Sequence, residues 1–500
     1  MAALSRFASL LRRRPATLPA ALERAARRWP ERDAFVNDEQ RLSFAELRRR
    51  ARVAASELAR RGVARGERFA LLLPNRLEWI VGFLAAAELG AVLVPLDTFY
   101  QPPELARAMR DCDVATLLCD DALLARVREG SIEDDALRVV LADELASWQQ
   151  GDEAPPATSR PDDDLLYIRT SGSTGIPKGI LMSQRRALAV AHAWRRFAPP
   201  TPDERCFSLA PLFRSPTLLG AALAGIYYGV SMILPASFTP AAVWQQIAHH
   251  RATIFHANPF HFAALADDES ARDEHGVAPR LRAIYSTGNR LPPPVQKRFE
   301  QRFGVRVEER YGTSEVGAIC KDGRPMRGVR IRIVDDEGRE RPRGEVGEIL
   351  VRTPLMATRY EGAPQASAEA FAGGWFHTGD MGRFEDDGRL RIVSRKKTAV
   401  EIGGRRVYAD VVLRALRAHP DVVDAVVLRE QHPDASATLR AVVVPRQGAT
   451  LAAETIAEHC RARLSRHAVP AHIEIREELP RSWKTVEDAA QLDYPRWGEA

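Results

Sequence analysis

Short apolar runs alternate with amphipathic segments over the first third of the chain. Two such runs cover residues 69–74 and 91–95, and each adjoins a stretch with apolar residues at helical spacing. Near the start, Leu18, Leu22 and Ala25 recur at the same spacing and predict a first helix. Strands that alternate with helices are typical of βαβ units, so we expect an α/β fold with mainly parallel sheets.

Later runs change character and predict antiparallel pairing. After a Pro- and Asp-rich loop at residues 151–164, strands are expected at 165–168 and 283–285. Residues 329–334 alternate between apolar and basic side chains, and a turn follows at 335–338. Two similar runs, at 348–351 and 389–393, complete the pattern. We therefore expect a β-subdomain of hairpins beside the parallel sheets.

The pattern becomes compact α+β after residue 395. Helices are predicted at residues 407–418 and about 452–464, with strands at 422–428 and 439–444. We predict a large N-terminal domain at residues 1–395 and a small mobile C-terminal domain at 396–500.

One uncharged stretch, residues 218–236, has about the length of a membrane span. Gly220, Gly225 and Gly229 interrupt it, and residues 230–235 have a strand pattern. We expect a buried helix that ends near Gly229, followed by a buried strand, and no stable membrane insertion.

Composition then narrows the class of protein. The 500 residues are 45% hydrophobic and 28% charged, which excludes a disordered or collagen-like chain. The net charge is +6, and basic and acidic residues are interspersed along the chain. Nucleic acid is therefore not an expected partner. Five scattered cysteines without a CxxC pair argue against a disulfide framework or zinc site and favour a reducing, cytoplasmic location. The Arg-rich start is read as part of a helix, with a transit peptide as the open alternative.

The strongest chemical signal is a run of glycines and hydroxyl residues that ends in a lysine, directly after the strand at 165–168. Glycines let backbone N–H groups approach an anion, hydroxyls add donors, and lysine supplies a compact charge for phosphate. Pro177 stands where a Walker A loop requires glycine, which excludes that motif. A plain surface turn needs neither so many donors nor the lysine. The predicted phosphate-binding residues are Thr170, Ser171, Gly172, Ser173, Thr174, Gly175 and Lys178.

This run resembles the phosphate loop of the adenylate-forming superfamily, which includes acyl-CoA synthetases, peptide-synthetase adenylation domains and firefly-type luciferases. Further segments resemble the family's motifs in the same order: residues 311–315, with Ser314 in place of threonine, then 374–380, and 394–397 followed by Gly403 and Gly404. One such motif could arise by chance, but several in the family's order are specific evidence for the resemblance. The resemblance implies a large AMP-binding domain and a mobile C-terminal domain.

The resemblance assigns roles that suit the chemistry of each residue. Tyr311 offers an aromatic face to adenine, and Glu315 is a hard oxygen ligand for Mg²⁺ on the triphosphate. Asp380 can accept hydrogen bonds from the ribose hydroxyls, and Arg395 can hold ribose or phosphate. The alternatives are that Tyr311 and Trp375 are core aromatics and that Asp380 and Arg395 form a surface ion pair.

Two glycines are expected to line the nucleotide and acyl pockets with their backbone. Gly288, with Asn289 beside it, resembles the family's second adenine-side loop, and Gly312 follows Tyr311. The side-chain role of Asn289 is left open.

The C-terminal lysine motif departs from the family pattern. The segment at residues 479–484 is shorter and lacks the glycine before the lysine. The resemblance makes Lys484 the catalytic lysine that bridges the acid and the α-phosphate, with a solvated surface lysine as the alternative. It also makes Lys397 the hinge about which the C-terminal domain rotates between the two half-reactions.

The implied reaction joins a carboxylic acid to AMP and then to a thiol, with ATP, Mg²⁺ and coenzyme A, or a carrier protein's phosphopantetheine, as cofactors. Arg214 occupies a position where acyl-CoA synthetases often have histidine. If it faces the pocket, it would repel an amino acid's ammonium and help bind a second anionic group on the acid; an arginine that points away is equally compatible. An acyl-carrier-protein ligase and a degenerate, non-catalytic nucleotide-binding protein are the alternative functions.

Overall fold

The structure, a computed structural model, describes most of the chain. The described residues are 15–130, 136–148, 151–154, 159–170, 178–194, 200–235, 237–288, 290–396, 399–402, 405–431, 437–446, 448–477 and 479. They form two compact units. The first comprises the described residues within Met1–Thr170, Pro177–Arg330 and Arg352–Gly374, and the second the remainder.

A six-stranded sheet in the first unit has the order β6-β5-β3-β4-β7-β8. Its strands pair in parallel except β8, which is antiparallel to β7. The strands are β3 (Arg68–Leu72), β4 (Val92–Pro95), β5 (Val114–Cys119), β6 (Arg138–Leu141), β7 (Asp164–Thr170) and β8 (Lys178–Ser183). The predicted strands at 69–74, 91–95 and 165–168 are confirmed.

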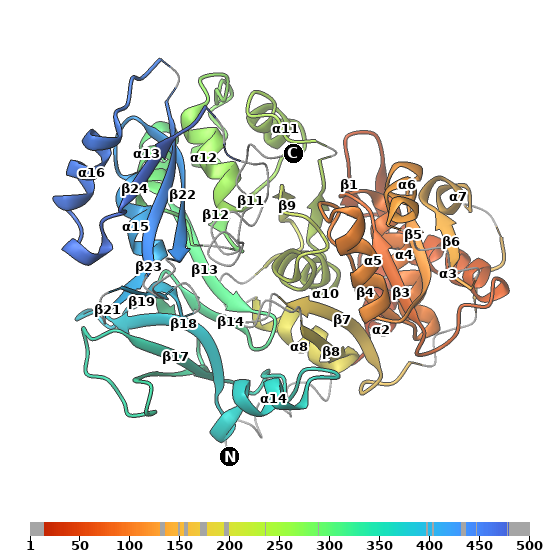
Figure 1. The fold of residues 1–500 in the computed structure, drawn as a ribbon. Helices are drawn as coiled ribbons and strands as arrows, with labels where there is room; N and C mark the ends of the chain where they lie inside the picture. The colour runs from red at the N-terminus through yellow and green to blue at the C-terminus, as the bar shows by residue number, and fades with distance from the viewer. Residues whose placement is uncertain are drawn as a thin grey trace. The chain divides into compact units, whose positions relative to one another are not determined.

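Helices cover both faces of this sheet (Figure 1). Along β3, Phe69 and Leu71 pack into one hydrophobic cluster, and Ala70 and Leu72 pack into another. Alternate side chains of a strand point to opposite faces, so a continuous apolar run is what a sheet buried on both sides requires. The helices of this region are α2 (Leu18–Arg28), α3 (Phe44–Arg60), α4 (Leu77–Leu89), α5 (Pro102–Asp111), α6 (Asp121–Glu129), α7 (Ala142–Ser147) and α8 (Gln184–Trp194).

A nine-stranded sheet in the same unit has the order β15-β14-β13-β12-β11-β9-β10-β1-β2. The strands from β13 to β1 are parallel, and antiparallel strands close both edges. The strands are β1 (Asp33–Val36), β2 (Arg41–Ser43), β9 (Arg205–Ser208), β10 (Ser231–Ile233), β11 (Ile254–Ala257), β12 (Ala283–Ser286), β13 (Val307–Thr313), β14 (Gly317–Lys321) and β15 (Arg324–Pro325). Trp244, Phe262 and Phe299, from three helices, form the core on one face. Those helices are α11 (Val243–His249), α12 (Pro259–Asp267) and α13 (Pro293–Phe303), with a 3-10 turn, η2 (Ala278–Arg280), between the last two.

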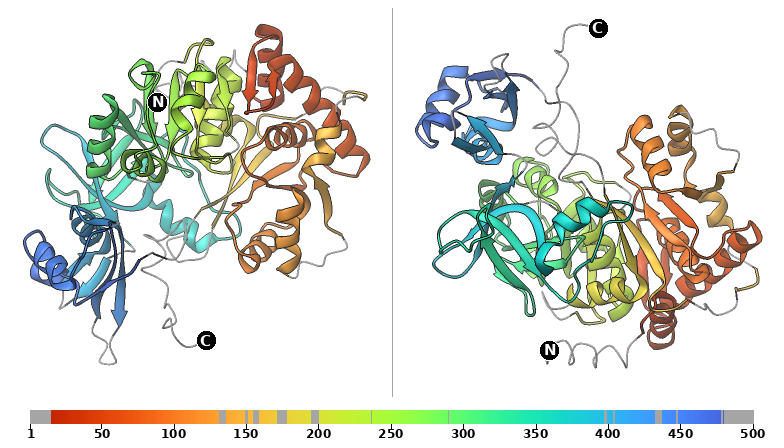
Figure 2. Two further views of the ribbon diagram at one scale, coloured as in Figure 1. Left: turned by 90° about the horizontal axis from the view of Figure 1, so that it is seen from above. Right: turned by 60° about the horizontal axis from the view of Figure 1, so that its bottom comes forward.

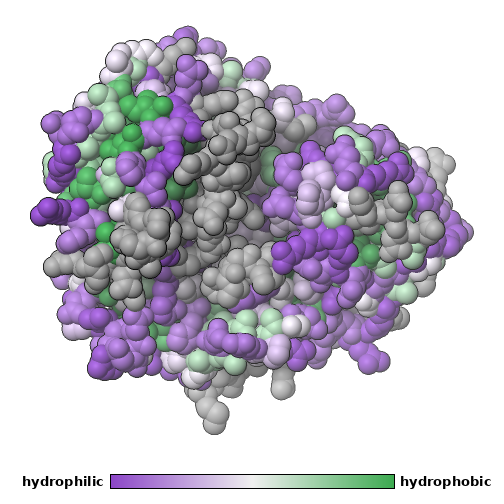
Figure 3. Space-filling model, in the orientation of Figure 1, coloured by the Kyte–Doolittle hydropathy of each residue, from purple (hydrophilic) through white to green (hydrophobic). Residues whose placement is uncertain are grey.

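The uncharged stretch forms a buried helical segment and a strand, as predicted. Helix α9 (Ser215–Thr217), the π-helix η1 (Leu218–Leu223) and α10 (Ala224–Tyr228) follow one another and end at Gly229, whose φ of 80° is left-handed. Strand β10 comes next. Among the described residues, no helix has the length and apolar character needed to cross a membrane. Hydrophilic residues predominate over the described surface on the face in Figure 3.

The second unit holds the hairpins. A four-stranded sheet has the order β16-β17-β18-β19, and β17, β18 and β19 are antiparallel neighbours, visible in Figures 1 and 2. These strands are β16 (Arg330–Val334), β17 (Gly347–Arg352), β18 (Phe376–Phe384) and β19 (Leu390–Arg395), which confirms the predicted β-subdomain. Helix α14 (Pro364–Ala370) precedes β18 in the chain and belongs to the first unit, as does the 3-10 turn η3 (Ala372–Gly374).

The C-terminal part is α+β, as expected, but one boundary differs. Helix α15 spans Ala409–Arg417, not 407–418, because Val407 pairs with Val400 in a hairpin that the sequence did not reveal. The hairpin is β20 (Ala399–Ile402) and β21 (Arg405–Tyr408); a second sheet holds β22 (Val422–Gln431), β23 (Ala437–Pro445) and β24 (His472–Ile475), beside α16 (Ala453–Arg461) and the 3-10 turn η5 (Arg466–Ala468). The domain boundary after residue 395 stays a prediction.

Candidate active site

The predicted phosphate loop connects two paired strands of the six-stranded sheet. Thr170, the last residue of β7, lies opposite Lys178, the first residue of β8. The Thr170 hydroxyl donates to the Lys178 carbonyl oxygen at 3.3 Å. The strands thus fix both ends of the loop. Its remaining predicted residues, Ser171, Gly172, Ser173, Thr174 and Gly175, lie outside the described residues.

Lys178 and Glu315 both contact one buried tyrosine, Tyr360. The Lys178 ammonium lies 5.2 Å from the centre of the Tyr360 ring. The Tyr360 hydroxyl donates to Glu315 Oε1 at 3.0 Å, and both side chains are buried. A cation over a ring and a carboxylate at its hydroxyl is a favourable arrangement. The structure therefore places the loop lysine and the predicted metal ligand around one side chain.

The backbone around Glu315 is held at several points. Ala357 N–H donates to the Glu315 carbonyl at 2.7 Å. The hydroxyls of Ser314 and Ser215 lie 2.6 Å apart. The Arg186 guanidinium, from α8, donates to the carbonyl oxygens of Ser314 and Glu315 at 3.1 and 2.8 Å. Glu315 is thus presented by a fixed segment.

A single protein carboxylate suits Mg²⁺. Among the described residues, no three His, Cys, Asp or Glu side chains gather as a metal site. Mg²⁺ keeps several waters and is usually held by one or two carboxylates together with substrate phosphates. The Glu315 carboxylate would therefore suit such an ion.

Tyr311 and Gly312 lie at the end of β13, where the pairing with β14 is irregular. Tyr311 is paired with Cys320 and Gly312 with Ala318, and the register shifts between them. A Cβ at Gly312 would lie 2.6 Å from the backbone oxygen of Gly317, so only glycine fits there. Gly312, which follows Tyr311, is itself exposed.

Gly288 follows β12, the parallel neighbour of β13. The carboxyl ends of parallel strands lie at one edge of a sheet, so Gly288, just after β12, and Tyr311, near the end of β13, lie toward the same edge. The φ of Gly288 is +95°, a conformation that favours glycine. Asn289 lies outside the described residues.

Next to Gly288 in the sequence is Thr287, which belongs to a buried row of hydrogen-bonded side chains that the sequence did not reveal. His256, on β11, has its Nδ1 2.9 Å from the Ser208 hydroxyl and its Nε2 2.7 Å from the Thr287 hydroxyl. Its ring stacks on Tyr285 with 4.6 Å between centroids. Burial, reinforced by the positive charge of Arg310, lowers the pKa of His256 to about 3. The imidazole is therefore neutral at neutral pH.

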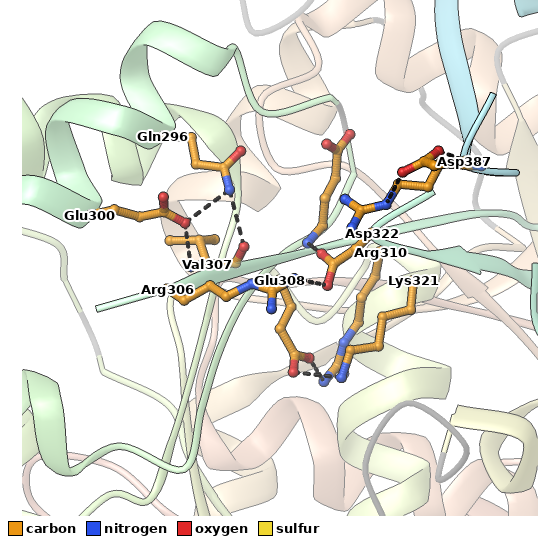
Figure 4. A network of polar contacts seen from close by, with 11 residues as sticks. Gln296, Glu300, Arg306, Val307, Glu308, Arg310, Lys321, Asp322 and Asp387 are labelled. Atoms are coloured by element: carbon orange, nitrogen blue, oxygen red, sulfur yellow. Dashed lines mark hydrogen bonds and ion pairs between the residues drawn. The ribbon is translucent and has the colours of Figure 1, made fainter. Parts of the chain in front are cut away.

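Charged side chains of residues 308–310 and their partners fix β13 to its neighbouring strands (Figure 4). The Glu308 carboxylate accepts hydrogen bonds from Lys321 at 2.6 Å and Arg310 at 3.0 Å. Burial opposes the ionisation of Glu308, but these two cations outweigh it and lower its pKa. The Arg310 guanidinium also lies 3.5 Å from the centre of the Tyr285 ring. This network ties β13 to β12 and β14 just before Tyr311 and Gly312, the predicted adenine-side residues.

Arg214 forms an ion pair with a buried carboxylate. Its Nη2 lies 2.8 Å from Asp97 Oδ2. The Arg214 side chain is 42% exposed, whereas that of Asp97 is 9% exposed. Asp97 Oδ1 accepts the Phe99 backbone N–H at 3.0 Å. Asp97 thus anchors the Arg214 guanidinium, and the predicted role toward the acid stays a prediction.

In the second unit, Asp380 and Arg395 lie opposite each other on β18 and β19. Arg395 Nε is 2.7 Å from Asp380 Oδ1, and the Asp380 side chain is only 5% exposed. The ion pair that the alternative interpretation expected is present, but its carboxylate is buried. Lys396 pairs with Glu348 at 2.9 Å and Asp336 at 3.2 Å. The predicted hinge Lys397, the glycines Gly403 and Gly404, and the predicted catalytic Lys484 lie outside the described residues.

Comparison with known proteins agrees with the resemblance. The AMP-binding enzyme model matches residues 22–361, and the AMP-binding enzyme C-terminal domain model matches residues 414–484. An oxalate–CoA ligase of Arabidopsis thaliana is 28% identical over 93% of this chain and 96% of its own. A feruloyl-CoA synthase of Amycolatopsis sp is 30% identical over 91% of this chain and 94% of its own.

A solved structure has the same fold. The o-succinylbenzoate CoA synthetase of Bacillus subtilis, in complex with its acyl-adenylate intermediate, superposes with a TM-score of 0.84 at 26% identity. The match covers 96% of this chain and 99% of that one.

Proposed function

The chain belongs to the AMP-binding enzyme family and is an AMP-forming acid–thiol ligase, and we propose that its thiol is coenzyme A. In the first half-reaction, a carboxylate oxygen attacks the α-phosphorus of ATP and pyrophosphate leaves. In the second, the thiol sulfur attacks the acyl carbon and AMP leaves. Both steps need positioning and charge neutralisation more than covalent chemistry by the protein.

The structural observation that supports acyl-AMP formation is the grouping of Lys178, Tyr360 and Glu315, whereas coenzyme A as the thiol is supported by the names of the similar proteins. Lys178 offers a positive charge to the phosphates of ATP, and Glu315 offers a carboxylate to the Mg²⁺ they bind. When bound, Mg²⁺ neutralises phosphate charge. Tyr311 and Gly312 supply the adenine side, and Gly288 lines the adjoining acyl pocket.

Two residues of the second unit, Asp380 and Arg395, have proposed roles toward the nucleotide. Asp380 accepts hydrogen bonds from the ribose hydroxyls. Arg395, which pairs with the Asp380 carboxylate in this structure, binds ribose or phosphate instead when the nucleotide is present. Lys484 bridges the acid and the α-phosphate in the first step. Rotation about Lys397 then withdraws it for thioester formation.

We propose that the acid carries a second anionic group held by Arg214. The guanidinium pairs with Asp97 and is 42% exposed, and its planar fork is of the kind that binds carboxylates. Oxalate and o-succinylbenzoate, named for two of the similar proteins, are dicarboxylates. Ferulate, the acid that corresponds to the feruloyl group named for another, has one carboxylate.

Thioester formation on a panel of acids tests both proposals. Oxalate, malonate, ferulate and benzoate are offered with ATP and either coenzyme A or a phosphopantetheinylated carrier protein. We expect coenzyme A thioesters and a preference for the diacids that Arg214→Ala abolishes. Asp97→Asn, which keeps the guanidinium and removes its anchor's charge, is the matched control and should preserve the preference. An unchanged preference in Arg214→Ala contradicts the role of Arg214, and thioester on the carrier protein alone contradicts coenzyme A.

We also propose a reducing, cytoplasmic environment, since all five cysteines are buried and unpaired.

A further inference from the structure

Arg186 is a partly buried cation that binds backbone carbonyls. Its Nε donates to the Leu355 carbonyl at 2.9 Å, and its Nη2 donates to the carbonyls of Ser314 and Glu315. These three acceptors come from two segments that are far apart in the sequence. A planar guanidinium, with donors fixed in a fork, can join them, and a lysine ammonium cannot reproduce that geometry.

This burial is costly. Burial lowers the pKa of Arg186 to about 10, opposed by the negative charge of Glu315, so the group stays protonated at neutral pH. Moreover, its Nη1 is buried without a hydrogen-bond partner among the described residues. Apolar side chains of similar volume often stabilise a fold as well as a buried charge does. A cation at this point therefore indicates a role beyond packing.

Tyr360 acts on the side chain of Glu315, where Arg186 acts on its backbone. The Tyr360 hydroxyl binds Oε1, its ring lies over the Lys178 ammonium, and its own backbone N–H donates to the Ser367 hydroxyl at 2.8 Å. Lys178 begins β8, and Arg186 lies on α8, the helix that directly follows β8. Strand β8 and helix α8 are thus joined to Glu315 in two ways: directly through Arg186, and through Tyr360, which Lys178 contacts.

We propose that Arg186 and Tyr360 are positioning residues that hold the Glu315 carboxylate in the orientation that receives the Mg²⁺ of MgATP. Arg186 fixes the backbone of residues 314–315, and Tyr360 fixes one carboxylate oxygen and leaves the other to the metal. The inference rests on the proposed role of Glu315. Loss of either residue should weaken the binding of MgATP and leave the binding of AMP, which lacks the β- and γ-phosphates, unchanged.

The test compares Arg186→Gln, Tyr360→Phe and Glu315→Gln with the wild type. Arg185→Gln is the matched control, because Arg185 adjoins Arg186 but forms a surface ion pair with Asp162. Binding of Mg²⁺ with a non-hydrolysable ATP analogue and binding of AMP are measured by calorimetry. Since groups that orient a metal ligand affect metal affinity by about 10- to 100-fold, we expect at least about a tenfold rise in the half-saturating Mg²⁺ concentration for the first three variants. AMP affinity and the control should not change.

Double variants separate the inference from its premise. If the two residues act through Glu315, adding Arg186→Gln or Tyr360→Phe to Glu315→Gln should cause no further loss of Mg²⁺ affinity. Unchanged Mg²⁺ affinity in Glu315→Gln would overturn the premise. A loss in Glu315→Gln with none in Arg186→Gln and Tyr360→Phe would overturn the inference alone. Should Arg186→Gln fail to fold, Tyr360→Phe, which keeps the ring, decides.

Discussion

The buried His256 makes a sharp prediction about the stability of the fold in mild acid. Its ring is fully buried, and both ring nitrogens are engaged by hydroxyls, of Ser208 and Thr287. Burial and the nearby charge of Arg310 disfavour a further positive charge on the ring. The change to test is His256→Gln, which keeps hydrogen-bonding capacity and cannot be protonated.

The magnitude follows from linkage. The pKa of His256 is about 3 in the folded chain, against an ordinary value of 6.5. The unfolded chain therefore binds the extra proton first, and the folded state loses stability as the pH falls from about 6.5 toward 3. At about 1.36 kcal/mol per pH unit, lowering the pH from 7 to 5 should cost the wild type about 2 kcal/mol through His256 alone.

The assay is urea denaturation at pH 7 and at pH 5, for both proteins. Other titrating groups, including His261, are common to the two and cancel in the comparison. We expect the free energy of unfolding to fall by about 2 kcal/mol more in the wild type than in His256→Gln. An equal fall in the two proteins would show that His256 is not held neutral by burial, and would refute the reasoning.

Three further predictions concern a glycine, the C-terminal lysine and the core. Gly312→Ala forces a methyl group to 2.6 Å from the Gly317 oxygen and should raise the KM for ATP, with a stability cost of about 1–3 kcal/mol, measured by kinetics and thermal melting. Lys484→Ala should abolish ATP–pyrophosphate exchange and spare thioester formation from supplied acyl-AMP; full exchange would disprove the assignment. Phe299→Ala, in the core beneath the nine-stranded sheet, should cost about 3–5 kcal/mol and leave the KM for ATP unchanged, since Phe299 lies outside the site.

Periodicity predicted much of the fold because a strand buried on both faces and an amphipathic helix each leave a clear pattern. The strands at 69–74 and 283–285 and the helical segment ending at Gly229 are examples. Periodicity failed at Val407, where two short strands pair through contacts that no local pattern encodes. The three-dimensional pairing of β13 with both β12 and β14 was likewise not evident.

The sequence likewise predicted one part of the candidate site and missed another. The motifs pointed to Lys178 and Glu315, which the structure brings to one tyrosine. Tyr360 itself lies 45 residues after Glu315, and nothing in the sequence says where its hydroxyl falls. Arg186 follows the phosphate loop on a helix whose other face is apolar, so its pattern matches an ordinary surface arginine. Both roles depend on tertiary contacts.

The central claim is that this chain joins a carboxylic acid to AMP, and acid-dependent ATP–pyrophosphate exchange tests it most directly. The purified protein is incubated with MgATP and labelled pyrophosphate, with each acid of the panel and with none. We predict that label enters ATP only when an accepted acid is present, with diacids the most effective. Label entering ATP without any acid, or no incorporation with any acid although the protein binds ATP, would contradict the account.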